Sequence, residues 1–317
     1  MKRTIINNIG AVFALSVALV MPDLLYAQVA SVRVVTIEGH RKRFDIPTED
    51  AIQRYLLIDV TNGDRDGDGV QDFEPLQPVA ILLLLPGGEG RLRLNSTGRE
   101  NGAAYFPIHT RYHFAAEGFI VAAMDAASDF LDHNHAPVED PPGSNFIHAS
   151  GLQGHRLSNR VYGNQYKQDL DAVINDLRGQ FPFLPLWVLG TSRGTESAVV
   201  AATELSDPPD GIVLTASVAG PSRRGDLSPE NVDLGRVSVP TLIVTNQDDQ
   251  CPGTSPEASK RLKERFTASP RVQLLIFNGG RTPLNEPCGA LTPHTFFGIE
   301  EQVVDAITKW IRDAEKK

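Results

Sequence analysis

The chain has 317 residues, of which 41% are hydrophobic, and its formal net charge is −9. This length exceeds that of a minimal domain and fits one large α/β domain with a sizeable core. An acidic chain without blocks of lysine and arginine is a poor binder of nucleic acid and of anionic membrane surfaces, so neither is expected as a partner.

The first 27 residues have the pattern of a secretory signal peptide. Lys2 and Arg3 precede an apolar stretch that ends at the small residue Ala27. No apolar run in the chain reaches the length of a membrane span. We therefore expect cleavage near Ala27, a mature domain of residues 28–317, an exported location (periplasmic or secreted), no membrane span and a monomer. A retained membrane anchor is the alternative.

An acidic loop follows the first two predicted strands, residues 31–37 and 54–60. The loop matches the D-x-D-x-D-G pattern of calcium sites, with ligands predicted from Asp64, Asp66, Asp68, the Val70 carbonyl and Asp72. Position twelve is Pro75 instead of the usual bidentate glutamate, although Glu74 is adjacent. The pattern favours a structural Ca²⁺, with a solvated acidic turn as the alternative.

Apolar runs and helical stretches then alternate along the chain. Continuous apolar runs are typical of parallel strands buried on both faces. Such runs occupy residues 78–88, 118–125, 184–190, 211–220, 240–246 and 272–280, and helical patterns occupy residues 166–181, 193–205 and 300–317. The alternation predicts an α/β fold with a mostly parallel central sheet and helices on both faces.

Two stretches interrupt the alternation, residues 126–165 and 220–239. The first is long and polar, and loops of this length are usually functional or disordered. It contains His133 and His135, whose spacing is too unspecific to favour a zinc site over a substrate-pocket loop or plain surface. The second has the size of a short cap over a site.

A serine lies between two glycines where a predicted strand meets a helix, in the sequence GTSRG at residues 190–194. Gly190 and Gly194 permit a turn too tight for a Cβ, which exposes the Ser192 hydroxyl at the carboxyl end of the sheet. A serine hydroxyl also needs a neighbouring base to become a nucleophile. The pattern therefore favours Ser192 as a nucleophile over a simple helix cap, provided that a base follows.

A base and an acid follow in the expected order of serine, acid and histidine. His294 is the only histidine after Ser192 and precedes the last predicted helix. Asp248 and Asp249 both end the strand at residues 240–246; we predict Asp249 as the acid and keep Asp248 in reserve. A surface turn and a packing histidine are the structural alternatives.

Donors for an oxyanion are predicted from the turn after residues 78–85 and from the residue after the serine. Gly87 and Gly88 let backbone N–H groups approach a substrate, and Gly88 is the stronger candidate. The N–H of Arg193 is the expected second donor. A plain glycine turn is the alternative.

These motifs resemble the α/β-hydrolase family, and more narrowly secreted bacterial serine hydrolases and esterases. The resemblance covers residues 75–312 and rests on the LPGG turn, GTSRG, the DQCP acid loop and the PHTFFGIE histidine loop. It implies Ser192 as nucleophile, Asp249 as acid, His294 as base and Gly88 at the oxyanion turn. The implied activity is cleavage of a small carboxylic ester through an acyl-enzyme, with no catalytic cofactor.

Two cysteines, Cys251 and Cys288, flank the predicted acid and base. Export and the even number favour one disulfide over two reduced buried thiols. Such a bridge would tie the acid loop to the histidine loop. Two functions compete with an esterase: a serine peptidase or amidase on the same triad, and a calcium-dependent binding module on a catalytically silent scaffold.

Overall fold

The computed structural model describes residues 30–43, 46–61, 76–88, 90–94, 105–131, 160–219 and 232–316. The expected signal peptide, the acidic loop at residues 64–72, His133 and His135, and most of the stretches 126–165 and 220–239 lie outside these residues. In the part of the chain that the structure describes, no helix combines the length and apolar character needed to cross a membrane.

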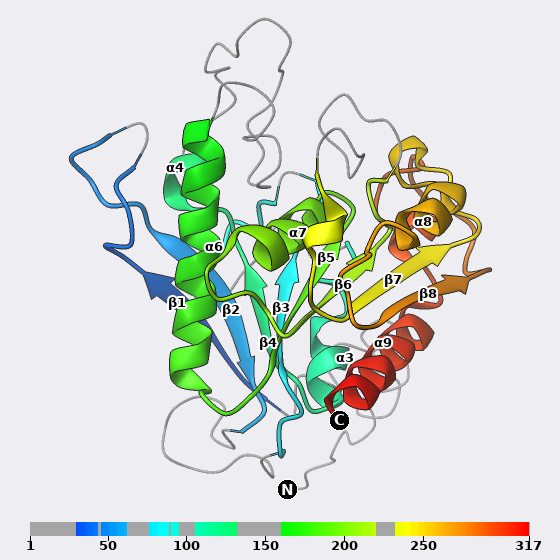
Figure 1. The fold of residues 1–317 in the computed structure, drawn as a ribbon, viewed down its shortest axis with the longest axis horizontal. Coiled ribbons are helices and arrows are strands. Elements are labelled where there is room, and N and C mark those ends of the chain that lie inside the picture. The colour runs from blue at the N-terminus through cyan, green and yellow to red at the C-terminus, as the bar shows by residue number, and fades with distance from the viewer. Residues whose placement is uncertain are drawn as a thin grey trace, which may run out of the picture.

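Eight strands form one sheet in the order β1-β2-β4-β3-β5-β6-β7-β8 (Figure 1). Strand β2 pairs antiparallel with β1 and β4, and every other neighbouring pair is parallel. The strands are β1 Ser31–Ile37, β2 Gln53–Asp59, β3 Ile81–Leu85, β4 Ile120–Met124, β5 Leu186–Thr191, β6 Gly211–Thr215, β7 Thr241–Asn246 and β8 Val272–Phe277. The prediction of a mostly parallel sheet is confirmed.

The five central strands, from β4 to β7 in the sheet order, are buried along their whole length. Their continuous apolar sequences follow from this position, because both faces of a parallel sheet are covered by helices. Edge strand β8 is only partly buried. The central strands thus form a rigid platform, and their loops can hold side chains in fixed positions.

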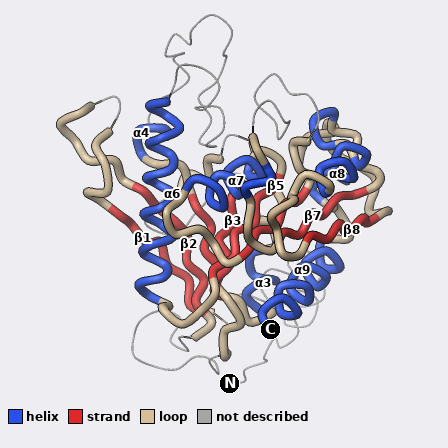
Figure 2. The backbone as a smooth tube through the Cα atoms, in the orientation of Figure 1, coloured by secondary structure: helices blue, strands red, loops and turns tan. Residues whose placement is uncertain are grey.

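Helices cover both faces of the sheet (Figures 1 and 2). Helices α6 and α7 pack against each other on one face, and α3 and α9 pack against each other on the opposite face. Helix α8 packs beside β7 and β8. The helices are α3 Arg111–Ala116, α4 Ser128–Leu131, α6 Arg160–Gln180, α7 Gly194–Glu204, α8 Pro256–Lys263 and α9 Glu300–Glu315.

Four helices differ from the prediction. Helix α6 begins at Arg160, six residues before the predicted start at Tyr166, and α4 lies inside the stretch predicted as loop, so the connection is shorter than predicted. The short helices α3 and α8 had no apolar stripe long enough to predict them. Helix α8 starts from a local signal instead, because the Ser255 hydroxyl accepts a hydrogen bond from the Ala258 N–H at 3.3 Å.

Candidate active site

The turn between β5 and α7 holds Ser192 in a strained conformation. Its φ is 52°, in the left-handed region that non-glycine residues rarely adopt. The Ser192 N–H donates to the Thr215 carbonyl at 3.0 Å, which ties the turn to the end of β6. Ser192 is partly exposed between two buried neighbours. The turn therefore presents this side chain at the carboxyl end of the sheet.

Both glycines of GTSRG are required by the packing of this turn. A Cβ on Gly190 would lie 2.1 Å from the Gly194 carbonyl oxygen, and a Cβ on Gly194 would lie 2.2 Å from the Leu85 carbonyl oxygen. Backbone atoms cannot move aside as the end of a flexible side chain can. The motif thus reflects close contact among β3, β5 and α7.

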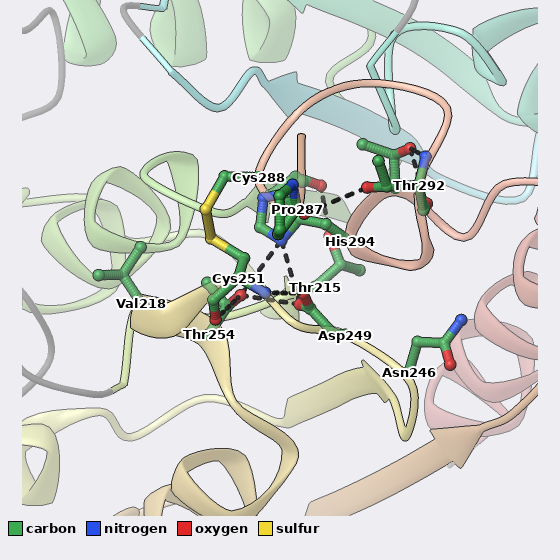
Figure 3. A network of polar contacts seen from close by, with 12 residues as sticks. Thr215, Val218, Asn246, Asp249, Cys251, Thr254, Pro287, Cys288, Thr292 and His294 are labelled. Atoms are coloured by element: carbon green, nitrogen blue, oxygen red, sulfur yellow. Dashed lines mark hydrogen bonds and ion pairs between the residues drawn. A yellow bond between two sulfur atoms is a disulfide. The ribbon is translucent and has the colours of Figure 1, made fainter. Parts of the chain in front are cut away.

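Asp249 and His294 form a buried pair (Figure 3). The His294 Nδ1 lies 3.1 Å from Asp249 Oδ2, and the two residues are 3% and 6% exposed. The other carboxylate oxygen, Oδ1, accepts the Cys251 N–H at 2.8 Å. These contacts hold the carboxylate in one orientation behind the imidazole.

The structure distinguishes between the two candidate acids. Asp248 is exposed, and its Oδ2 accepts the Gly279 N–H at 2.8 Å, away from the imidazole. Asp249 is the residue that contacts His294. The first choice made from the sequence therefore has the geometry of a histidine partner, and the reserve does not.

A third residue, Thr254, contacts both Asp249 and His294, and the sequence analysis did not predict it. Its Oγ1 donates to Asp249 Oδ2 at 2.8 Å and lies 3.1 Å from His294 Nδ1. Thr254 is 1% exposed and ends the short 3₁₀ turn Pro252–Thr254. A threonine five residues after an aspartate carries no recognisable motif, so only the fold identifies it.

The predicted disulfide is present between Cys251 and Cys288. Figure 3 shows it linking the acid loop to the segment that leads to His294. In that segment the Thr292 hydroxyl donates to the Gly289 carbonyl at 2.9 Å, and His294 follows in the turn Pro293–Thr295. The histidine loop is therefore held by an internal hydrogen bond and by a disulfide to the acid loop.

The glycine turn after β3 approaches the serine closely. A Cβ on Gly87 would lie 3.1 Å from the Ser192 Cβ and 2.9 Å from the Thr191 carbonyl oxygen. Gly88 has a φ of 62°, which glycine adopts without strain. Arg193 immediately precedes α7. The backbone segments predicted to bind an oxyanion are thus brought beside Ser192.

A buried aspartate, Asp125, organises the segment after the glycine turn. Its carboxylate accepts backbone N–H groups from Leu92 at 2.7 Å, Arg93 at 3.1 Å and Leu94 at 2.7 Å. Burial raises the pKa of the Asp125 carboxyl, while the backbone donors act in the opposite direction. Asp125 directly follows β4, so the sheet fixes the position of this segment.

These segments surround one pocket of about 540 Å³. Ser192, Arg193, His294, Gly87 and Gly88 all line it, so the structure brings the predicted residues together; Asp249 lies behind His294. The remaining lining residues are Pro86, Arg91, Leu92, Arg93, Tyr105, Phe106, Thr191, Val218, Cys251, Gly253, Thr254 and Cys288. The pocket is large enough for a small organic substrate.

One group of metal-ligating side chains occurs among the described residues, and none of its members lines this pocket. His113 and Glu117 of α3 and Asp305 of α9 bring ligand atoms within 4.8 Å of one another. His113 Nε2 lies 3.2 Å from Asp305 Oδ1, and Glu117 forms a 2.8 Å ion pair with Arg312. These contacts account for the cluster as helix-to-helix ion pairs.

Comparison with protein-family models finds no match, and comparison with curated proteins finds none either. Solved structures with similar folds include dienelactone hydrolase from Anabaena variabilis ATCC 29413, with a TM-score of 0.53, 13% identity, and coverage of 90% of this chain and 98% of that one. A carboxyl esterase from Bacillus coagulans has a TM-score of 0.52 and 12% identity over 89% of this chain and 98% of its own.

A third similar structure is MGS-M1, an α/β hydrolase enzyme from a Medee basin deep-sea metagenome library. Its TM-score is 0.51 at 13% identity, with coverage of 89% of this chain and 98% of that one. The strand order of the sheet and the similar structures indicate the same fold. The chain has the α/β-hydrolase fold.

Proposed function

We propose that the protein is an exported serine hydrolase that cleaves carboxylic esters through an acyl-enzyme on Ser192. One observation carries the proposal: the buried Asp249–His294 pair adjoins the same pocket as a serine held at positive φ. Backbone strain of this kind is concentrated at functional sites. One of the similar structures is a carboxyl esterase by name, which agrees with the proposal.

In the proposed mechanism, His294 carries its proton on Nδ1, donates it in a hydrogen bond to Asp249, and leaves Nε2 as the base. Nε2 takes the Ser192 proton while Oγ attacks the ester carbonyl, and it then protonates the departing alcohol. In the second step Nε2 takes a proton from water while the water oxygen attacks the acyl carbonyl, and it then returns the proton to the departing Ser192 Oγ. Asp249 stabilises the imidazolium that forms in both steps.

The oxyanion of each tetrahedral intermediate requires hydrogen-bond donors. The backbone N–H groups of Gly88 and Arg193 are proposed for this role, because both residues line the pocket beside Ser192. The reaction uses no organic cofactor. A structural Ca²⁺ bound by residues 64–72 remains part of the proposal.

Hydrolysis of an acyl-chain series of 4-nitrophenyl esters by the mature protein tests the proposal, with Ser192→Ala as the variant. The matched control is Ser259→Ala, because Ser259 is buried in α8 and does not line the pocket. We expect turnover by wild type and the control, and none above background by Ser192→Ala. Folded wild type that cleaves no ester, or Ser192→Ala that retains turnover, would refute it; cleavage of the matched 4-nitroanilides alone would indicate an amidase.

A further inference from the structure

We propose that the pocket selects esters carrying an anionic group, a carboxylate remote from the scissile bond, and that Arg93 and Arg91 bind this group. The proposal deepens the proposed function and rests on it. Three arginines, Arg91, Arg93 and Arg193, line the pocket, and none of its described lining residues is acidic. This lining contrasts with the chain as a whole, whose net charge is −9.

The segment that carries two of these arginines is built to present them. Leu92 and Leu94 are 1% and 5% exposed and belong to the hydrophobic core, whereas Arg93 between them is exposed. The apolar side chains therefore anchor the segment, and Arg93 lies at the pocket on the outer side. The buried leucines on either side hold the backbone of Arg93 in place, whereas the guanidinium at the end of its side chain keeps rotational freedom.

The backbone at Arg93 is strained, with a φ of 56°. A non-glycine residue in this region costs free energy, which the surroundings must offset. The buried carboxylate of Asp125 does so by accepting the N–H groups of Leu92, Arg93 and Leu94. Glycine would adopt this conformation without strain, so an arginine at this position indicates a use for its side chain.

A guanidinium matches a carboxylate in geometry as well as in charge, because its planar N–H groups can donate two parallel hydrogen bonds. Arg91 and Arg93 line the same pocket as Ser192, so one substrate molecule can present an anionic group to the arginines and an ester to the serine. Tyr105 and Phe106 also line the pocket and supply apolar surface for the connecting chain. The inferred substrate is thus an ester that also carries a free carboxylate, on its acyl or its alcohol side.

Matched ester pairs test this inference. One pair carries the charge on the acyl side: the mono-4-nitrophenyl ester of glutarate and that of glutaramate, its neutral amide twin. The other carries it on the alcohol side: the acetyl esters of 4-hydroxybenzoate and 4-hydroxybenzamide. The variants are Arg93→Gln and the matched control Arg261→Gln, since Arg261 is an exposed arginine of α8 outside the pocket.

We expect wild type to favour the carboxylate member of at least one pair by about tenfold in kcat/KM, the effect of one charge-assisted hydrogen bond. Arg93→Gln should reduce that ratio to near one, Arg261→Gln should keep it, and 1 M NaCl should weaken it because exposed charges are screened. Equal or lower rates for both carboxylate esters, or an unchanged ratio in Arg93→Gln, would overturn the inference while leaving the hydrolase intact.

A binding measurement separates this inference from the proposed function. Calorimetric titration of Ser192→Ala with monomethyl glutarate and with methyl glutaramate reports recognition without turnover. Tighter binding of the carboxylate, lost in Ser192→Ala/Arg93→Gln, would support the anion site even if wild type cleaved no ester. Equal binding within this pair, and within the pair of 4-acetoxybenzoate and 4-acetoxybenzamide, would refute the anion site, whatever the activity.

Discussion

At the scale of single residues, the position of Asp249 behind His294 predicts that Asp249, and not Asp248, supports the histidine in catalysis. Asp249→Asn would remove the negative charge that stabilises the imidazolium and would favour the wrong tautomer. We expect kcat for ester hydrolysis to fall by about 10⁴, the size of this effect in serine proteases. Asp248→Asn should leave kcat near the wild-type value, because Asp248 is exposed and bonds to Gly279. The reverse pattern in steady-state assays would transfer the role to Asp248.

In the proposed mechanism Thr254 would act through Asp249 and His294, as a positioning residue. Thr254→Val keeps its shape but removes the hydroxyl that donates to the carboxylate. Loss of one such bond, worth about 1.5 kcal/mol, should lower kcat by about tenfold. Thr254→Ser should restore most of the rate, since it returns the hydroxyl. Equal losses in both variants would indicate that the methyl group matters and the hydrogen bond does not.

The chain order of serine, acid and histidine predicts Ser192, Asp249 and His294 as a triad, because each follows a recognisable strand or precedes a recognisable helix, and the structure places Asp249 against His294. Thr254 and Asp125 could not be found in this way. Their partners are brought to them by the fold: Asp125 contacts residues more than 30 positions away, at Leu92, Arg93 and Leu94. No local pattern records contacts of that kind.

At the scale of elements, a buried ion cluster joins the β1–β2 connection to two helices. Arg41 bonds to Asp169 of α6 through Nε at 2.6 Å and to Asp129 of α4 through Nη1 at 2.6 Å, and His40 Nε2 lies 2.6 Å from the same Asp169 oxygen. Burial alone would lower the pKa of Arg41, but the two carboxylates raise it overall. The guanidinium is therefore charged at every pH of interest.

Removing this cation should destabilise the fold strongly. Arg41→Met leaves two carboxylates that are at most 1% exposed without their main partner, so we expect the free energy of unfolding to fall by about 3–5 kcal/mol. Arg33→Met on β1 is the matched control, because Arg33 is 47% exposed and its ion pair should contribute less than about 1 kcal/mol. Urea unfolding at pH 7 measures both, and equal losses would contradict the account.

Helices and strands were predictable where an apolar run or an apolar stripe extended over enough residues. The two predicted strands and the six apolar runs together located the eight strands of the sheet to within a few residues, and the stripe at residues 166–181 located most of α6. The start of α6 was missed because residues 160–165 are polar and resemble a loop. Helices α3 and α8 were missed because six and eight residues are too few to establish a period. Local capping and tertiary packing decide such short elements.

At the scale of the whole molecule, the disulfide links two loops that the sheet alone does not hold together. Residues 281–288 are exposed, so this segment before the buried His294 has the bridge as its covalent tie to the acid loop. For a sequence separation of 37 residues, loop-closure entropy predicts a stabilisation of about 4 kcal/mol. Replacing both cysteines, in Cys251→Ser/Cys288→Ser, should lower the free energy of unfolding by up to this amount and lower kcat.

Urea unfolding with and without reductant provides the control for that prediction. Reductant should destabilise the wild type and leave the double variant unchanged. If the oxidised wild type and the double variant unfold at the same urea concentration, the bridge contributes nothing to stability. Its remaining role would then be to position His294.

In the proposed mechanism the fold activates Ser192 as a nucleophile, and covalent labelling of this serine measures the activation. The mature protein is treated with a fluorophosphonate, and the modified residue is located by mass spectrometry of its peptides. We predict one adduct, on Ser192, formed quickly by the wild type, slowly by Asp249→Asn and not at all by Ser192→Ala. A folded wild-type protein that remains unlabelled, or that is labelled at another residue, would contradict the claim.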